Sequence, residues 1–205
     1  MRRILLATRS EGKLRELRPL FAAHGFAAFD LREAGIAESA IEDELEAFPT
    51  FEENALAKAR YFHVASGRPT VADDSGLVVP SLGGKPGVLS KRWSGRSDLT
   101  GHALDDENNR LLLRELENAH DRRAYYVCAA AYVDGERELV CRGEVYGRIV
   151  EVARGAGGFG YDPYFLSDEL GRTFGEASAA EKARVSHRAR AFAALVDRIG
   201  DGGRS

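Results

Sequence analysis

The sequence predicts a mixed α/β fold. Apolar runs of strand length are interspersed with longer segments whose apolar residues recur every three or four positions. Two Ser/Thr-x-x-Glu sequences mark helix starts, and an Asp-Gly pair marks a β-hairpin. With 205 residues, 44% of them hydrophobic and 30% charged, the chain is long enough to bury a core, and neither disorder nor a fibrous repeat fits this composition.

The predicted elements are, in chain order, a strand at 3–7, helices at 13–23 and 51–65, a strand at 70–72, a helix at 101–117, a hairpin of 125–133 with 137–150, and a helix at 179–199. In the first helix, Leu14, Leu17 and Phe21 share one face. Thr50 opens the second helix through a capping box, and Gly67 stops it.

The middle of the chain is expected to contain turns and a hairpin. The buried strand at 70–72 should deliver residues 73–76 into a turn, and residues 83–87 should form a second glycine-rich loop. Asp134-Gly135 predicts a two-residue turn that sets Cys128 opposite Cys141. In a reducing compartment this pair indicates packing of two thiols, not redox chemistry.

The last part of the chain combines a shaped loop with a capped helix. Residues 155–163 are too rich in glycine and aromatic side chains for a regular element. Ser178 opens the last helix through a second capping box, and the tail at 201–205 should fray. Because composition shows no linker, repeat or boundary, we predict one domain over residues 1–200.

Composition excludes several classes of function. The formal net charge of −3 gives no general attraction for nucleic acid. The longest apolar stretches fall short of the roughly 18 residues of a membrane span, and the N-terminus does not have the pattern of a signal peptide, so a soluble cytoplasmic protein is expected. Two cysteines and five histidines show no zinc-type spacing.

The loop before the first helix is a candidate anion site. It comprises Thr8, Arg9, Ser10, Glu11, Gly12 and Lys13. Backbone N–H groups and the helix dipole favour an anion there, and Lys13 adds a positive charge. The spacing is not that of a P-loop, and an ordinary capped turn explains the same residues.

Two adjacent carboxylates, Asp73 and Asp74, follow the strand at 70–72. Their mutual repulsion is offset by a cation or by hydrogen bonds, and magnesium prefers such oxygen ligands. A solvated turn is the alternative interpretation. The acidic run at 42–46 is by itself typical of a solvated surface.

The glycine-rich loop and the last helix carry possible base-recognition groups. In residues 157–162, glycines allow a close backbone approach, Phe159 offers a ring for stacking and Asp162 an acceptor. Lys182, His187 and Arg188 fall on the first turns of the predicted helix. A structural loop and an ordinary basic helix face are the alternatives.

Six motifs occur in a characteristic order. They are Leu5-Leu6-Ala7-Thr8 with Gly12-Lys13, Thr50-Phe51-Glu52-Glu53-Asn54-Ala55 with Lys58-Ala59, Ala72-Asp73-Asp74-Ser75-Gly76-Leu77, Leu82-Gly83-Gly84-Lys85-Pro86-Gly87, Gly157-Gly158-Phe159-Gly160-Tyr161-Asp162-Pro163, and Glu181-Lys182 with Ser186-His187-Arg188. Together they resemble the inosine/xanthosine triphosphate pyrophosphatase family, over essentially the whole chain. That family removes non-standard purine nucleotides such as ITP, dITP and XTP from the nucleotide pool.

The resemblance implies an α/β fold with a long mixed β-sheet, flanking helices and two lobes around a central active-site cleft, assembled as a homodimer. It implies hydrolysis between the alpha and beta phosphates, with magnesium held near the triphosphate. The implied roles are, for catalysis, Asp74 with support from Asp73 and Lys58; for magnesium, Glu46 and Asp74; for phosphate and sugar, residues 8–13 and Ser75; and for the base, Phe159, Gly160, Tyr161, Asp162, Lys182, His187 and Arg188.

One departure from the family pattern concerns the first loop, where Thr-Gly-Asn is usual and this chain has Thr8-Arg9-Ser10. Ser10 offers a hydroxyl where an amide offers both donor and acceptor, and Arg9 is the candidate to compensate. Two rival functions stay open: a pyrophosphatase acting on modified pyrimidine or other nucleotides, and a nucleotide-sensing module without turnover. Asp73, Asp74 and Lys58 argue against the second.

Overall fold

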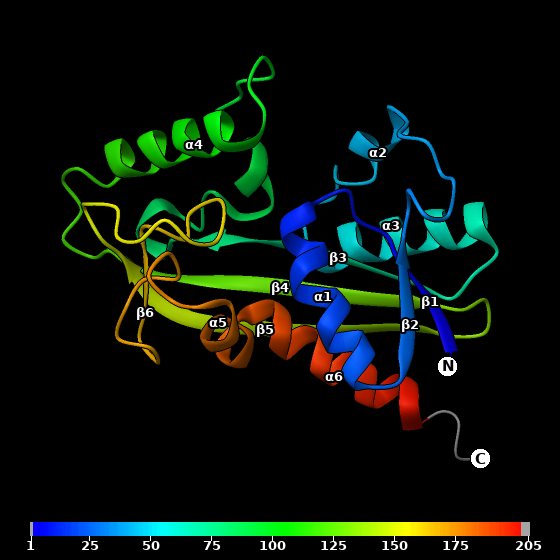
Figure 1. The fold of residues 1–205 in the computed structure, drawn as a ribbon. Coiled ribbons are helices and arrows are strands. Elements are labelled where there is room, and N and C mark those ends of the chain that lie inside the picture. The colour runs from blue at the N-terminus through cyan, green and yellow to red at the C-terminus, as the bar shows by residue number, and fades with distance from the viewer. Residues whose placement is uncertain (1, 202–205) are drawn as a thin grey trace. The chain divides into compact units, whose positions relative to one another are not determined.

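The computed structural model describes residues 2–201, apart from the side chains of Asp43 and Asp201 (Figure 1). Its elements are, in chain order, β1 (Arg2–Leu6), α1 (Glu11–Ala23), β2 (Phe26–Asp30), α2 (Ile41–Glu44), α3 (Phe51–Ser66), β3 (Thr70–Val78), η1 (Pro80–Leu82), η2 (Gly87–Arg92), α4 (Gly101–Glu115), β4 (Arg123–Val133), β5 (Glu138–Ile149), β6 (Phe165–Ser167), α5 (Ala179–Val185) and α6 (His187–Asp201). The predicted α/β class is confirmed.

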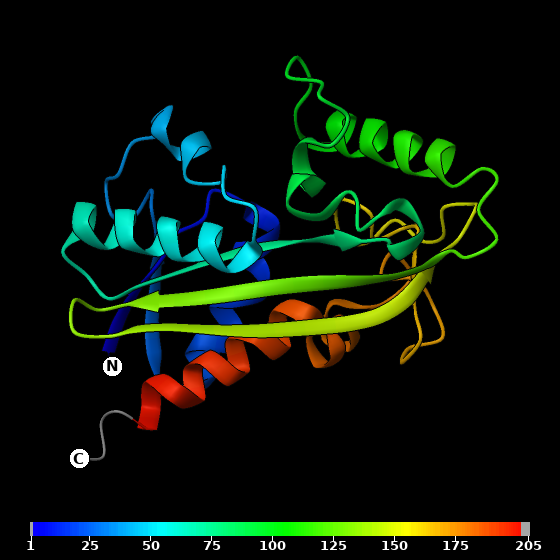
Figure 2. The same ribbon diagram turned by 180° about the vertical axis from the view of Figure 1, so that it is seen from behind.

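The strands form one six-stranded sheet in the order β2-β1-β3-β4-β5-β6. β1 pairs in parallel with β2 and β3, whereas β6 pairs antiparallel with β5. Parallel neighbours need a crossover connection, which α1 and α3 provide. β4 and β5, with 11 and 12 residues, are the long hairpin strands in Figure 2. The long mixed sheet implied by the resemblance is therefore confirmed.

The predicted helix caps are present. Ser178 accepts the N–H of Glu181, whose carboxylate accepts the N–H of Ser178, so the capping box at α5 is complete. Thr50 caps α3, and Gly67 ends it in the left-handed region at φ 62°. Such an N-cap contributes about 0.5–2 kcal/mol to stability. These local hydrogen bonds explain why α3 and α5 begin where the sequence indicates.

Two predicted boundaries are wrong. β3 continues through residues 73–76, where we expected a turn. Asp73 and Asp74 are buried and bound by side chains of flanking helices, and this pairing outweighs their preference for turns. The last helix is interrupted, because Ser186 has an extended backbone with ψ 150° between α5 and α6. The sequence analysis also missed the short elements β2, α2 and β6.

The hairpin turn is displaced by one residue. The N–H of Asp134 donates to the carbonyl of Arg137, and at the other end the N–H of Ile149 donates to the carbonyl of Arg122. Both bonds define the same antiparallel register, with Gly135 and Glu136 as the turn residues.

In this register Cys128 pairs with Gly143, and Cys141 with Ala130. The expectation that the two cysteines face each other directly is therefore wrong by two residues. Both are free thiols, buried in one hydrophobic cluster, as a packing role requires.

Contacts divide the chain into two compact units, Met1–Asp74 with Cys128–Gly143 and His187–Ser205, and Ser75–Val127 with Glu144–Ser186. In the core of the first, the ring of Phe21 meets those of Phe26 and Phe192 edge-on, at 5.8 and 5.7 Å between centroids. The predicted single domain over 1–200, its two lobes and its cleft stay predictions. Of the predicted tail at 201–205, all but Asp201 lies outside the described residues.

Candidate active site

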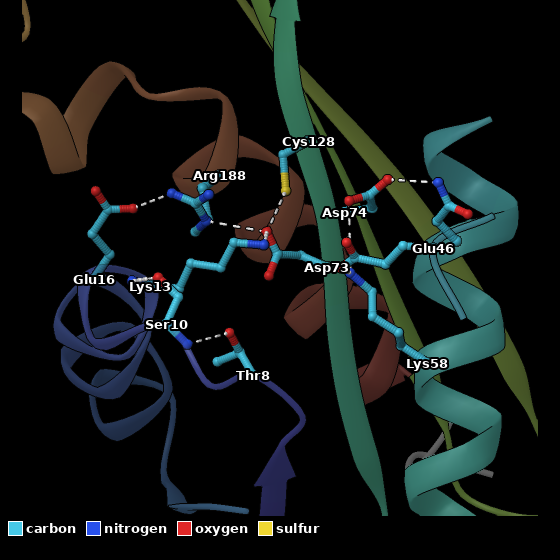
Figure 3. Close-up of polar contacts among 11 residues, drawn as sticks. Thr8, Ser10, Lys13, Glu16, Glu46, Lys58, Asp73, Asp74, Cys128 and Arg188 are labelled. Atoms are coloured by element: carbon cyan, nitrogen blue, oxygen red, sulfur yellow. Dashed lines mark hydrogen bonds and ion pairs between the residues drawn. The ribbon is translucent and has the colours of Figure 1, made fainter. Parts of the chain in front are cut away.

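β3 presents consecutive carboxylates to opposite faces, because side chains alternate along an extended strand (Figure 3). Asp73 is 2% exposed and Asp74 6%. Asp73 faces α1 and the start of α6, whereas Asp74 faces α3. The two carboxylates therefore have different partners, and each can play a different chemical part.

Asp73 is held by two cations. Its Oδ2 lies 3.0 Å from Lys13 Nζ and 3.3 Å from Arg188 Nε, and the Cys128 thiol is 3.8 Å away. Its Oδ1 is buried without a hydrogen-bond partner among the described residues. Burial alone favours the neutral carboxyl, but the charges of Lys13 and then Arg188 outweigh it and hold the pKa of Asp73 far below its ordinary value. Asp73 is therefore ionised and fixed.

Arg188 is itself buried, with 2% of its side chain exposed. Its Nη1 donates to Glu16 on α1, at 2.5 Å. Burial opposes the charged form, but Asp73 and Glu16 raise the pKa of Arg188 above its ordinary value. Glu16 was missed by the sequence analysis. Its position three residues after Lys13, on the same helix face, was the available signal.

Asp74 contacts two side chains of α3. Asn54 Nδ2 donates to its Oδ2 at 2.9 Å, and Lys58 Nζ lies 3.6 Å from its Oδ1. Lys58 lies closer to Glu46, at 2.7 Å from Oε1. Burial is the largest influence and raises the pKa of Asp74, because Lys58 and the Asn54 hydrogen bond compensate it only in part. Asn54 had no predicted role, although it is one helical turn from Lys58.

Glu46 and Asp74 thus meet around one ammonium group. Burial lowers the pKa of Lys58, but the charges of Glu46 and Asp74 outweigh it, and the net shift is upward. Carboxylate oxygens that converge on a cation are the donors that Mg²⁺ prefers. Among the described residues no group of three or more His, Cys, Asp or Glu is arranged to hold a metal. Two carboxylates suffice where substrate phosphates and water complete the shell.

The loop before α1 has one open side. Ser10 caps the helix through the N–H of Lys13, and its own N–H donates to Thr8 Oγ1. Within the described chain, the N–H groups of Glu11 and Gly12 have no acceptor. A helix N-terminus with such donors suits an anion.

Arg9 points elsewhere. Its guanidinium makes two hydrogen bonds to Glu42, at 2.7 and 3.1 Å, and donates to the carbonyls of Ile36 and Ala37. Glu42, which we expected to be solvated, is thus the anchor of this arginine. These contacts join the first loop to α2, and the predicted compensation for Ser10 has no support in this arrangement.

A second cluster lies in the glycine-rich loop and α5. Asp162 Oδ2 lies 2.6 Å from Lys182 Nζ and accepts the N–H of Phe159 at 2.9 Å, while Tyr126 donates to Oδ1 at 3.3 Å. The ammonium of Lys182 lies 4.7 Å from the Phe159 ring centroid and 5.5 Å from that of Phe174. A cation over an aromatic face adds attraction. The expectation that Phe159, Asp162 and Lys182 come together is met.

α4 fixes the same loop from its other side. Asp105 accepts the N–H of Gly160 at 3.0 Å, and Asn109 donates to the carbonyl of Gly160 at 2.9 Å. Tyr161 is buried and donates to the carbonyl of Ser90 at 2.7 Å. Tyr161 therefore anchors the loop, and neither Asp105 nor Asn109 was foreseen.

The remaining predicted site residues are located as follows. His187 is the first residue of α6 and 4% exposed. Ser75 follows Asp74 along β3 and is partly exposed. Glu11 is exposed and lies 3.4 Å from Arg32 Nη2. None of these positions by itself defines a chemical role.

Paired acidic and basic side chains on a central strand, with open N–H groups at a helix start, define an α/β protein of the class that acts on phosphorylated ligands. The model of the Ham1 family matches residues 4–198. The chain belongs to the Ham1 family, which confirms the resemblance seen in the sequence.

Individual relatives agree. The dITP/XTP pyrophosphatase of Ralstonia nicotianae is 45% identical over 202 residues, with 97% of each chain covered. That of Mycolicibacterium paratuberculosis is 48% identical, with 94% of this chain and 93% of the relative covered. A solved Ham1 protein from Coxiella burnetii has a TM-score of 0.84 and 33% identity, covering 98% of this chain and 100% of that one. A nucleoside-triphosphatase / dITP/XTP pyrophosphatase from Mycobacterium abscessus has a TM-score of 0.72 and 41% identity, covering 94% and 97%.

Proposed function

We propose that this protein hydrolyses the non-standard purine nucleotides dITP, ITP and XTP to the nucleoside monophosphate and pyrophosphate. Full-length relatives carry the name dITP/XTP pyrophosphatase. The observation that carries the assignment of residues is the division of labour on β3, where Asp73 is locked by Lys13 and Arg188 while Asp74 keeps a raised pKa beside Lys58 and Glu46.

The reaction needs a nucleophilic water and neutralised phosphate charge. Asp74 accepts a proton from the water, whose oxygen bonds to the alpha phosphorus while the bond from that phosphorus to the bridging oxygen breaks. A raised pKa suits a general base. Glu46 and Asp74 would hold Mg²⁺, which neutralises phosphate charge when bound. Lys58 keeps these two carboxylates oriented toward each other.

Phosphate groups are proposed to bind at the start of α1. The N–H groups of Glu11 and Gly12 are available as donors, and Ser10 with Thr8 shapes the loop. Lys13 adds positive charge while it holds Asp73. The contacts of Arg9 with Glu42 favour an anchoring role for this residue over phosphate contact.

The base is proposed to be recognised by Phe159, Asp162 and Lys182, with His187 and Arg188 contributing donors. Phe159 offers a face for stacking, and the ion pair of Asp162 with Lys182 holds the loop in shape. Donors directed at the 6-keto oxygen would be left unpaired by the 6-amino group of adenine, which disfavours ATP. GTP shares that oxygen, so its rejection depends on position 2.

The homodimer and the cytoplasmic location implied by the resemblance are part of this proposal. No helix in the described part of the chain has the length and apolar character needed to cross a membrane. Sedimentation of the purified protein over a range of concentrations tests the dimer, because a dimer has twice the mass of one chain.

Pyrophosphate release from dITP, ITP, XTP, ATP, GTP and TTP, with and without Mg²⁺, tests the function. Magnesium-dependent release from dITP, ITP and XTP, with little from the other three, is the expected result. Release from TTP derivatives but not ITP would favour the rival pyrimidine-directed enzyme. Tight binding of ITP without release of pyrophosphate would favour the nucleotide-sensing module.

A further inference from the structure

The second compact unit contains a cavity of about 510 Å³ where β4 begins and β5 ends. It is lined by His120, Asp121, Arg122, Arg123, Arg148, Ile149, Val150, Glu151, Val152 and Arg154. None of these residues belongs to the clusters around Asp73, Asp74 or Asp162. Cavities of this volume accommodate small-molecule ligands.

The lining carries an excess of positive charge. Four arginines stand against the carboxylates of Asp121 and Glu151. Arg123 is neutralised locally, because its Nη2 lies 2.6 Å from Asp121 Oδ2. Arg148 and Arg154 form no ion pair within the described residues, although Arg154 lowers the pKa of Glu176 through its charge. Two exposed guanidinium groups thus face the cavity region without a carboxylate bound to them.

Arg122 supplies a donor that the protein does not use. Its Nε donates to the carbonyl of Ile149 at 2.9 Å and its Nη1 to the carbonyl of Leu116 at 2.8 Å. These two bonds fix the guanidinium plane. Its Nη2 is buried and has no acceptor among the described residues. Buried donors in native proteins are almost always satisfied, so such a group on a cavity wall indicates a ligand acceptor.

We infer that this cavity binds a small phosphate-bearing anion at a site distinct from the residues assigned to catalysis. Guanidinium groups form paired hydrogen bonds with phosphate oxygens, and a fixed arginine loses little freedom on binding. Arg122 provides the fixed donor, while Arg148 and Arg154 close around the anion. The exposed side chain of Val152, at 71%, offers an apolar contact for a non-phosphate part of the ligand.

Inorganic pyrophosphate is the probe, and backbone amide NMR on the full chain is the readout. Titration without magnesium should produce saturable shifts at residues 120–123 and 148–154. In a variant with Arg148→Gln and Arg154→Gln, these shifts should need at least tenfold more pyrophosphate. A control variant with Arg15→Gln and Arg68→Gln removes the same charge from exposed positions outside the cavity and should titrate like the wild type.

Three results would overturn the inference: shifts that do not saturate, shifts that are the same in both double variants, and shifts confined to residues 8–13. Occupation of the cavity by a second copy of the chain would appear as protein-concentration-dependent shifts at residues 148–154 without pyrophosphate, and would also overturn it. Because no turnover is measured, failure of this test leaves the proposed pyrophosphatase function untouched.

Discussion

Arg188 Nε lies 3.3 Å from Asp73 Oδ2, between side chains that are 2% and 1% exposed and 115 positions apart in the chain. A buried charge pair stabilises a fold only weakly in net terms, but the loss of one partner leaves the other charge buried and unmatched. This relationship joins the start of α6 to β3 and thereby fixes the face of β3 on which Asp73 lies.

Replacement of Arg188 should therefore destabilise the protein strongly. We expect Arg188→Met to lower the free energy of unfolding by about 3–5 kcal/mol. Arg60→Met is the matched control, since Arg60 pairs with Glu138 at exposed positions and such a pair is worth about 0–1 kcal/mol. Urea unfolding followed by circular dichroism measures both. Equal losses in the two variants would contradict the role given to the buried pair.

Removal of the Asp74 carboxylate should abolish turnover without unfolding the protein. Asp74→Asn keeps an oxygen for Asn54 but cannot accept a proton, so a loss of about 10²–10⁴-fold in kcat is expected. Asp106→Asn, at an exposed position of α4, should leave kcat unchanged. Near-normal pyrophosphate release by Asp74→Asn would rule out the assigned role.

Two glycines of the loop at 155–163 should respond differently to alanine. Gly160 has φ +62° and open space around its Cα, so Gly160→Ala should cost only the left-handed strain of about 1–2 kcal/mol. Gly158 has φ +75°, and a Cβ there would overlap the carboxylate of Asp162, which binds Lys182. Gly158→Ala should be less stable than Gly160→Ala and should raise KM for ITP more. The reverse order in thermal melts and kinetics would argue against the Asp162 contact.

Asp105 should make stability depend on pH. Burial is the main cause that raises its pKa, and Gly160 N–H opposes the shift. A raised folded-state pKa means that the ionised group destabilises the fold at neutral pH, and that this penalty fades as pH falls through the folded pKa. Asp105→Asn should therefore raise the melting temperature at pH 7.5 by about 2–4 °C at most, with a smaller gain at pH 4.5.

Asp98 is the control of opposite sign. Arg96 lowers its pKa to about 2, so ionised Asp98 favours the fold above its unfolded pKa and loses this effect as pH falls toward 2. Asp98→Asn should not raise the melting temperature at pH 7.5. A stabilising effect of similar size in both variants would show that a general change in charge, not burial of Asp105, is responsible.

The sequence by itself determined the features that depend on near neighbours. The helix starts at Thr50 and Ser178, the stop at Gly67 and the place of the hairpin follow from bonds between residues a few positions apart. The ordered motifs also determined the family, because they span the chain. In each case the information lies within a window of a few residues, or in the order of such windows.

Only the tertiary structure decided which of these residues meet. Asp73 and Asp74 are neighbours in sequence, yet strand alternation turns one to Lys13 and Arg188 and the other to Asn54 and Lys58. The turn preference of residues 73–76 was overridden because these distant partners satisfy the buried carboxylates. Arg9 turned to Glu42 for the same reason, since pairing over 33 positions depends on where the chain brings the two side chains. Local patterns carry no information about such distances, and the order of strands in the sheet sets them.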